Sequence, residues 1–319
     1  MRQSLNRDTV VVITGASSGI GRAAAVQFAR RGSCLVLASR DQAALQPVVD
    51  QCAAQGARAL AVETDTRDDQ AVRRLAARAL EAFGRIDVWV NNAGVAVFGR
   101  FEETPAEAHD QVIRTNLMGY IHGAHAALPV FLEQDAGILI NVVSMAGWAP
   151  TPLAASYTAS KFGNRGFSEA LRIELGGRPR IKICDVYPAF VDTPMLEHVG
   201  NYSGHRLVPV PLVVAVDAVA RKIVALAQRP RDFNPIGVTF PAAVIFHALT
   251  PRLFRWTVAR ATKVFLAVAP RAPRTDAALF TPSTGGPASG GLRSPAWRAA
   301  FGVAAVTAGV VWLARRRRR

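Results

Sequence analysis

Thr9-Val10-Val11-Val12-Ile13-Thr14 is followed directly by Gly15-Ala16-Ser17-Ser18-Gly19-Ile20-Gly21, and this stretch decides the fold. Its first half is β-branched and does not alternate with polar residues, which is typical of a strand covered on both faces of a parallel sheet. A helical stretch follows at 22–31. Glycines admit close backbone approach, and the free N–H groups of a helix N-terminus favour an anion. The stretch therefore predicts a phosphate cradle, with a tight turn that binds nothing as the alternative.

The second apolar run, 34–38, is predicted as a strand that ends at Ser39-Arg40. A dinucleotide site places at this strand end either an acid for the ribose hydroxyls or an arginine for a 2′-phosphate. Arg40 supplies the cation, whereas Asp41 stands where the next helix needs an N-cap. We therefore expect NADP(H) in preference to NAD(H), which remains the alternative.

Strands and helices alternate along the rest of the body, which predicts an α/β fold with a Rossmann-type doubly wound parallel sheet of about seven strands and helices on both faces. Asp65 follows the third strand and could accept from an adenine amino group, or serve as a loop cap. Asn91-Asn92-Ala93-Gly94 follows the fourth strand and could tie neighbouring loops or contact a cofactor. The remaining predicted strands lie at 57–62, 86–90, 138–143, 180–186 and 236–240, and the helices at 68–83, 105–132 and 215–228.

A phenol and an ammonium group stand four residues apart in Tyr157-Thr158-Ala159-Ser160-Lys161. On a helix this spacing puts both on one face, where the cation can favour the phenolate and make the tyrosine a usable acid or base. Taken alone, the pair is a weak signal, because a tyrosine and a lysine at this spacing often occur by chance as an exposed pair. Ser144 follows a buried strand, at the edge where open α/β sheets place ligands, and a loop can bring its hydroxyl beside the phenol.

The chain resembles the classical short-chain dehydrogenases/reductases over roughly residues 8–240. The resemblance rests on the glycine motif at 14–21, Asn91-Asn92-Ala93-Gly94, Asn116, Ser144, the Tyr157 and Lys161 pair, and 188–193, all in family order. The family usually has a glycine after the proline that corresponds to Pro188, in the loop over the nicotinamide carboxamide. This chain has Ala189 at that position. The resemblance implies hydride transfer between nicotinamide C4 and a carbonyl or secondary alcohol, with a homo-oligomer as the family's usual assembly.

The implied roles are specific. Tyr157 would be the general acid, Lys161 would lower its pKa and hold the nicotinamide ribose, Ser144 would polarise the carbonyl, and Asn116 would hold a relay water. We expect NADPH-dependent reduction of an apolar or lipid-like small molecule; a catalytically silent nucleotide-sensing or membrane scaffold protein on the same fold is the alternative. The expected cofactor-binding residues are Gly15, Ser17, Ser18, Gly19, Ile20, Gly21, Arg40, Asp65, Asn92, Ala93, Gly94, Tyr157, Lys161, Pro188, Val191 and Thr193.

Composition excludes some other functions. The formal net charge is +15, but residues 252–319 carry +12 of it, which argues against a nucleic-acid-binding main domain. The three cysteines and the histidines show no ligand spacing, so we expect no metal and free thiols in a reducing compartment. Because no apolar leader precedes the first strand, we expect a cytoplasmic catalytic domain.

The chain is expected to divide at residue 240. The catalytic domain, 1–240, precedes a basic amphipathic helical extension, 241–269, which could lie on an anionic bilayer or pack against the body or a second subunit. Residues 270–297, rich in Pro, Gly and Ser, are predicted to be a disordered linker. An uncharged stretch at 299–314, next to a terminal arginine run, makes 298–319 a candidate membrane anchor, although as a helix it spans only about 24 Å. A helix packed on a partner, or a frayed tail, is the alternative.

Overall fold

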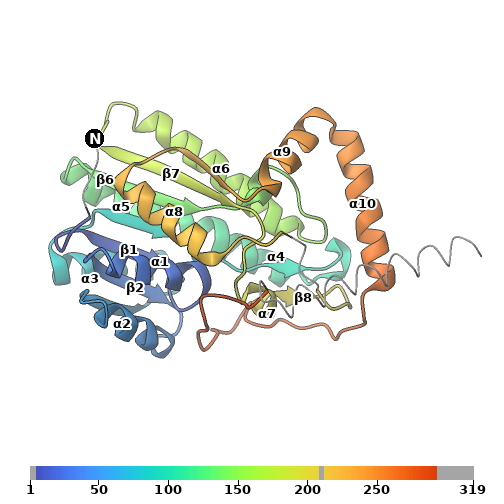
Figure 1. Cartoon of the computed structure of the whole chain (residues 1–319), viewed down its shortest axis with the longest axis horizontal. Helices are drawn as coiled ribbons and strands as arrows, with labels where there is room; N and C mark the ends of the chain where they lie inside the picture. Colours follow the sequence, from blue (N-terminus) through green and yellow to red (C-terminus); the bar gives the residue numbers. More distant parts are fainter. Residues whose placement is uncertain (1–4, 208–211, 293–319) are drawn as a thin grey trace, which may run out of the picture.

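The computed structural model describes residues 5–207 and 212–292 of the 319-residue chain. One twisted sheet of seven parallel strands forms its centre, in the order β3-β2-β1-β4-β6-β7-β9, with helices on both faces (Figure 1). This arrangement confirms the predicted α/β class and doubly wound sheet. The strands are β1 (Val10–Thr14), β2 (Cys34–Ser39), β3 (Ala59–Glu63), β4 (Val88–Asn91), β6 (Gly137–Val142), β7 (Ile181–Pro188) and β9 (Phe233–Ile236).

The helices of the body follow the strands as right-handed crossovers require. One face of the sheet is covered by α1, α2 and α8, and the other by α3, α5 and α6 (Figure 1). Their bounds are α1 (Gly19–Ala29), α2 (Gln46–Ala53), α3 (Asp69–Phe83), α4 (Ala106–Ile113), α5 (Gly119–Glu133), α6 (Ala155–Glu174) and α8 (Val216–Gln228). A short α7 (Met195–His198) and a two-stranded pair, β5 (Val97–Phe98) with β8 (Gly200–Asn201), lie beyond the carboxyl edge of the sheet.

The apolar run of β1 explains why both faces need cover. Val11 and Ile13 pack into the core under α1 and α8, whereas Val12 packs into the core under α3 and α5. All three are fully buried. Because successive side chains of a strand point to opposite faces, a continuous apolar run is stable only between two layers of helices.

The last strand begins three residues earlier than expected and ends four residues earlier. We predicted a strand at 236–240, but β9 ends at Ile236 and α9 (Thr239–Leu249) begins soon after. Gly237 has a φ of +110°, and a Cβ there would come within 2.8 Å of the Ala189 side chain, so the chain turns sharply at this point. The apolar run after Gly237 has no polar break, and such runs do not distinguish a strand from a helix by periodicity.

The segments after α9 agree with the prediction in one part and differ in another. The amphipathic helix expected in 241–269 is present as α10 (Pro251–Val268). Residues 270–292, predicted to be part of a disordered linker, instead follow a defined path along the carboxyl edge of the sheet, with Leu279 fully buried. The reason is that backbone carbonyls of this segment are hydrogen-bonded by side chains of the body. The candidate anchor, 298–319, lies outside the described residues.

Candidate active site

The glycine-rich turn joins β1 to α1 as expected. Gly15 and Gly19 have φ values of +65° and +54°, which favour glycine. A Cβ at Gly21 would collide with the carbonyl oxygen of Gly15, so the first helical turn packs directly on the loop. The result is a backbone cradle at a helix N-terminus, which is the arrangement that anion binding requires. This cradle fits the pyrophosphate of a dinucleotide.

Asn91 and Asn92 fix the neighbouring loop. The Asn92 side-chain amide donates to the carbonyl oxygens of Thr14 and Gly15, at 2.9 and 3.0 Å. Asn91 is fully buried and donates to the Asn141 side chain at 3.0 Å. Of the two possibilities left open by the sequence, the structure shows the tying of loops. Asn92, Ala93 and Gly94 nevertheless line the cavity beside the glycine turn.

Ser144 is held in an unusual backbone conformation. It follows β6, with φ 151° and ψ 160°, a region that residues other than glycine rarely adopt. Its hydroxyl accepts from the N–H of Ala146 at 3.1 Å. Strained backbone of this kind costs roughly 1–3 kcal/mol and gathers at functional sites, where the surrounding structure holds it in place. Ser144 also lines the cavity beside the glycine turn, so the strained residue lies at the candidate site.

Tyr157 and Lys161 lie one turn apart on α6, as the spacing predicted. The Lys161 Nζ is 5.7 Å from the centre of the Tyr157 ring. Burial raises the pKa of Tyr157, and a hydrogen bond with Ser144 opposes that rise. The Ser144 hydroxyl therefore favours the ionised phenol, against the effect of burial.

Lys161 is almost completely enclosed. Its side chain is 3% exposed, and its ammonium group donates to the Val142 carbonyl oxygen at 3.1 Å and to the Tyr120 hydroxyl at 3.5 Å. Burial lowers the pKa of Lys161 to about 7, since an ion loses its hydration in the protein interior. Burial therefore makes the neutral amine easier to form here than it is in water.

Asn116 lies within one π-helical turn, Arg114–Met118, between α4 and α5. Its side chain accepts from Val95 N–H and donates to Val95 O, both at 2.8 Å. Its own carbonyl oxygen accepts from the Asn164 amide at 2.8 Å. Such π-turns occur often at functional sites. Asn116 is fully buried behind the cavity wall, and no sequence pattern indicated its partner Asn164.

One cavity of about 290 Å³ joins these groups. It extends from the glycine turn past Ser144, Tyr157 and Lys161, and its apolar wall includes Phe98 and Met195. Of the predicted site residues, Gly21 and Asn116 lie behind the wall. The others all line the cavity: Gly15, Ser17, Ser18, Gly19, Ile20, Arg40, Asp65, Asn92, Ala93, Gly94, Ser144, Tyr157, Lys161, Pro188, Val191 and Thr193.

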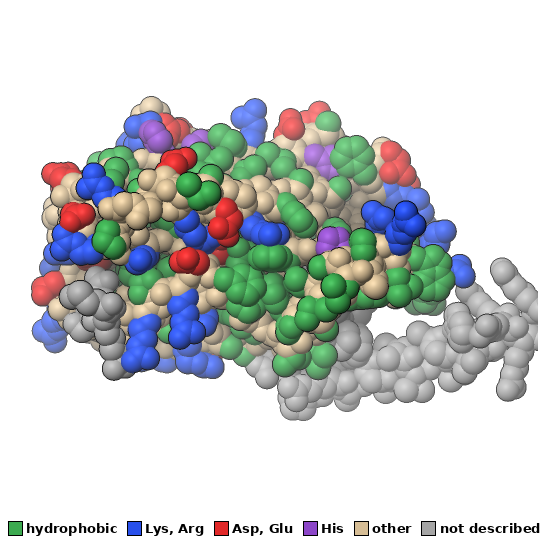
Figure 2. All heavy atoms as spheres, turned by 90° about the horizontal axis from the view of Figure 1, so that it is seen from above, with side chains coloured by type: hydrophobic (Ala, Val, Ile, Leu, Met, Phe, Trp, Pro, Cys, Tyr) green, Lys and Arg blue, Asp and Glu red, His purple; other side chains and the backbone are tan. Residues whose placement is uncertain are grey.

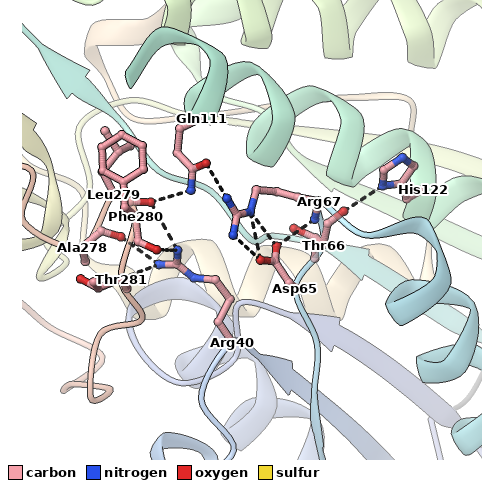
Figure 3. A network of polar contacts seen from close by, with 10 residues as sticks. All are labelled: Arg40, Asp65, Thr66, Arg67, Gln111, His122, Ala278, Leu279, Phe280 and Thr281. Carbon is pink, nitrogen blue, oxygen red and sulfur yellow. Dashed lines mark hydrogen bonds and ion pairs between the residues drawn. The ribbon is translucent and has the colours of Figure 1, made fainter. Parts of the chain in front are cut away.

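Arg40 and Asp65 reach the cavity but are engaged by other groups (Figure 3). The Arg40 guanidinium donates to four backbone carbonyls of residues 278–281. Asp65 is paired with Arg67, with a shortest N–O distance of 2.5 Å. Burial alone would raise the pKa of the Asp65 carboxyl, but the hydrogen bonds and the charge of Arg67 together outweigh it and lower the pKa. The sequence did not indicate Arg67 or residues 278–281 as neighbours of the site.

Comparisons with known proteins agree with this geometry. Residues 9–202 match the family model described as short chain dehydrogenase. An uncharacterized oxidoreductase of Bacillus subtilis, YxnA, is 33% identical, with 98% of this chain and 91% of the relative covered. The 11-beta-hydroxysteroid dehydrogenase A of Sesamum indicum is 31% identical over 77% of this chain and 73% of that protein.

Solved structures give the same result. An alcohol dehydrogenase from the archaeon Thermococcus sibiricus, complexed with 5-hydroxy-NADP, is 27% identical with a TM-score of 0.62, covering 73% of this chain and 97% of that one. A metagenomic short-chain oxidoreductase in complex with NADP is 29% identical with a TM-score of 0.62 over the same shares. The chain belongs to the short-chain dehydrogenase family. It is therefore an oxidoreductase of a family whose solved members include complexes with NADP.

Proposed function

We propose that this protein transfers a hydride between NADP(H) and a carbonyl or secondary alcohol of an apolar small molecule. The observation that carries the proposal is that Ser144, Tyr157 and Lys161 line one cavity together with the glycine cradle. Bound NADPH supplies the hydride from C4 of its nicotinamide. The residues that would hold it are the glycine turn, the loop at 92–94 and the segment 188–193, all of which line that cavity.

In the direction of reduction, the side chains act on the carbonyl oxygen. Negative charge grows on that oxygen as the hydride arrives at carbon, and hydrogen bonds aimed at it stabilise the transition state. Tyr157 donates its phenolic proton to the oxygen, and the Ser144 hydroxyl donates a second hydrogen bond. A charged Lys161 favours the phenolate that remains. Asn116, held in its π-turn, holds the relay water through which the proton is replaced.

Replacing Tyr157 with Phe tests this function. The variant lacks only the phenolic hydroxyl, so the fold and the dinucleotide site should persist. Because general acid catalysis contributes about 10²- to 10⁴-fold, kcat/KM for a hydrophobic aldehyde should fall by at least about 100-fold. The NADPH dissociation constant, measured by fluorescence titration, should change less than about threefold. Turnover at the wild-type rate would reject the assignment, and NADPH binding by a wild type without turnover would favour a silent nucleotide-binding protein.

The preference for NADP(H) rests on Arg40. This guanidinium reaches the cavity at the end of β2, where a dinucleotide places its adenine ribose. Two solved relatives named above hold NADP or 5-hydroxy-NADP, which supports the same choice. The apolar wall of the cavity and the hydroxysteroid dehydrogenase among the relatives support an apolar substrate. Membership of the family further supports a homo-oligomer.

Replacing Arg40 with Gln tests the cofactor preference. The change removes the cation that would pair with a 2′-phosphate, which NAD(H) lacks. The ratio of the NADH and NADPH dissociation constants should therefore fall by about tenfold or more, which corresponds to the loss of one charge-assisted pair. The ratio is the informative quantity, because any effect of Arg40 on residues 278–281 enters both constants equally. A ratio unchanged from the wild type would reject Arg40 as the selecting residue.

We also propose that α9 and α10 contact an anionic membrane surface. The stretch 239–268 contains three arginines, one lysine and no acid. Large apolar side chains are exposed on the same two helices: Ile245 (55%), Leu249 (77%), Leu253 (52%) and Trp256 (60%). Figure 2 shows hydrophobic and basic side chains side by side at the end of the molecule that carries α10.

An anionic lipid surface matches this face better than a second copy of the chain. A two-fold interface would bring the same cations, Arg252, Arg255, Arg260 and Lys263, against themselves. An amphipathic helix with cations beside apolar residues is the usual form of interfacial binding. Within residues 5–207 and 212–292, no helix has the length and apolar character needed to cross a bilayer.

A further inference from the structure

Residues 277–292, called here the C-terminal strap, lie along the edge of the sheet that carries the active site (Figure 1). Leu279 is fully buried in a small cluster with Val97, Val112 and Tyr202. The Gln111 amide donates to the Leu279 carbonyl oxygen at 2.7 Å, and Tyr202 is hydrogen-bonded to Asp276, the residue just before the strap. The strap therefore docks through a buried side chain and not only through surface contacts.

The strap carbonyls accept hydrogen bonds from both terminal nitrogens of Arg40 (Figure 3). One guanidinium nitrogen donates to the carbonyl oxygens of Ala278 and Thr281, at 2.8 and 3.0 Å, and the other to those of Leu279 and Phe280, at 3.3 and 3.4 Å. Burial lowers the pKa of Arg40, with Asp65 opposing that shift. Arg40 is the cation proposed for the 2′-phosphate, so strap oxygens stand where phosphate oxygens would.

The strap also covers the glycine turn. The N–H of Gly19, at the start of α1, donates to the carbonyl oxygen of Pro287 at 3.1 Å. The Arg22 guanidinium donates to the carbonyl oxygen of Gly286 at 2.7 Å. A helix N-terminus at a glycine turn is the place where a dinucleotide puts its pyrophosphate. A second set of strap oxygens therefore stands at the second anion position.

Two further observations indicate that the strap and a dinucleotide exclude each other. Asp192, within the proposed cofactor segment 188–193, fixes the end of the strap by accepting from Ser289 Oγ and Leu292 N–H, both at 2.8 Å. The cavity that remains, with Ala278, Pro282, Ser283 and Leu292 in its wall, has a volume of about 290 Å³. Pockets for drug-sized ligands start at about 300 Å³, and a dinucleotide is larger than such ligands.

We propose that the strap is an intramolecular occupant of the dinucleotide site, and that residues 278–290 must leave before NADP(H) binds. The inference rests on the proposed use of a dinucleotide. The carbonyl oxygens of the strap are neutral acceptors. Phosphate oxygens would form charge-assisted hydrogen bonds with Arg40 of roughly twice the strength. The apparent dissociation constant equals the intrinsic constant divided by the fraction of molecules in which the strap is released. Release of the strap is thereby a means of controlling cofactor binding.

A reversible cross-link tests the proposal in the full-length chain. A Cβ on Gly286 would lie 3.7 Å from the Ser18 Cβ, within the 3.5–4.5 Å range of disulfides. In a Ser18→Cys/Gly286→Cys double variant, oxidation should lock the strap onto the glycine turn. Cys34, Cys52 and Cys184 are free and buried, so they should not compete. We expect NADPH to bind at least about tenfold more weakly to the oxidised form, with full recovery on reduction.

The comparison of redox forms within one variant cancels any effect of the substitutions themselves. The two single cysteine variants, treated with the same oxidant, serve as matched controls and should show no redox dependence. Leu279→Ala, which removes the buried anchor of the strap, should bind NADPH more tightly than the wild type. Equal or tighter binding by the cross-linked form would overturn the proposal while leaving the proposed function intact. Absence of NADPH and NADH binding in both redox forms and in the wild type would overturn the proposed function itself.

Discussion

Lys161 shows how position sets the chemistry of a single residue. Its sequence spacing from Tyr157 predicted a shared helix face, and the structure places both groups in one cavity. The sequence could not show that the ammonium group is enclosed by the Val142 carbonyl and the Tyr120 hydroxyl. Tyr120 lies 41 residues from Lys161 in the chain, and no local pattern links the two. The depressed pKa is therefore a property of the fold.

This pKa makes a prediction about stability. Lys161 has a pKa of about 7 in the folded protein and 10.5 as its ordinary value, so between these pH values the unfolded chain binds one more proton. The free energy of unfolding should therefore gain a contribution from Lys161 as pH rises through this window, by about 1 kcal/mol per pH unit. The contribution is complete above pH 10.5 and absent below pH 7.

Urea unfolding of the full chain without cofactor between pH 7 and 8.5 measures this effect. The wild type should show a steeper rise in stability with pH than a Lys161→Met variant, because only the wild type carries the titrating group. An exposed lysine on β7 offers the matched control, Lys182→Met, whose slope should equal that of the wild type. Parallel slopes for the wild type and Lys161→Met would show that the ammonium group keeps its ordinary pKa.

At the scale of elements, strands and helices were predictable wherever burial left a clear apolar pattern in the sequence. Strands β1 and β2 are continuous apolar runs because helices cover both faces, and α8 matched its predicted range within one residue. β9 was misplaced because it is an edge strand with exposed positions and Pro235 within it. A half-exposed edge strand need not be uniformly apolar, so its sequence carries a weaker signal.

The strap was missed for a different physical reason. The strap docks through its backbone carbonyls, which accept hydrogen bonds from side chains far away in the sequence. The Gln111 side chain is 168 positions from its acceptor, and the Arg22 side chain is 264 positions from its acceptor. Every residue carries a carbonyl, so composition cannot show which ones will accept a hydrogen bond. Proline and glycine also reduce the regular structure that periodicity detects. A segment of this composition is therefore interpreted as a linker even where the fold provides a site for it.

At the scale of the whole molecule, charge is distributed unevenly. Residues 1–251 carry a formal net charge of +3, and the rest of the chain carries +12. Part of this excess lies on α10, beside exposed apolar side chains and at one end of the body (Figure 2). An apolar substrate that partitions into a bilayer would be most concentrated near such a surface. Placement of the active site close to lipid would then raise the local substrate concentration without any change in the catalytic groups.

Vesicle binding tests this placement in the full-length protein. Cosedimentation should be strong with vesicles containing phosphatidylglycerol and weak with phosphatidylcholine alone, since each cation near an anionic surface contributes about 1 kcal/mol. A variant with Arg252, Arg255, Arg260 and Lys263 all replaced by Gln should bind at least about tenfold more weakly. The five arginines at 315–319 are also basic, so replacing them with Gln provides the matched comparison.

Trp256 gives an independent measurement at the same surface. Its side chain is 60% exposed, and the Arg260 guanidinium lies 5.7 Å from its ring centre, so insertion into a lipid interface should shift its emission to shorter wavelength. A Trp256→Phe variant should lose most of the vesicle-induced shift while still cosedimenting. If the shift persists in that variant, or if only the 315–319 substitutions weaken binding, α10 is not the contact surface. Loss of binding in the α10 charge variant together with loss of the shift in Trp256→Phe would place this helix at the membrane.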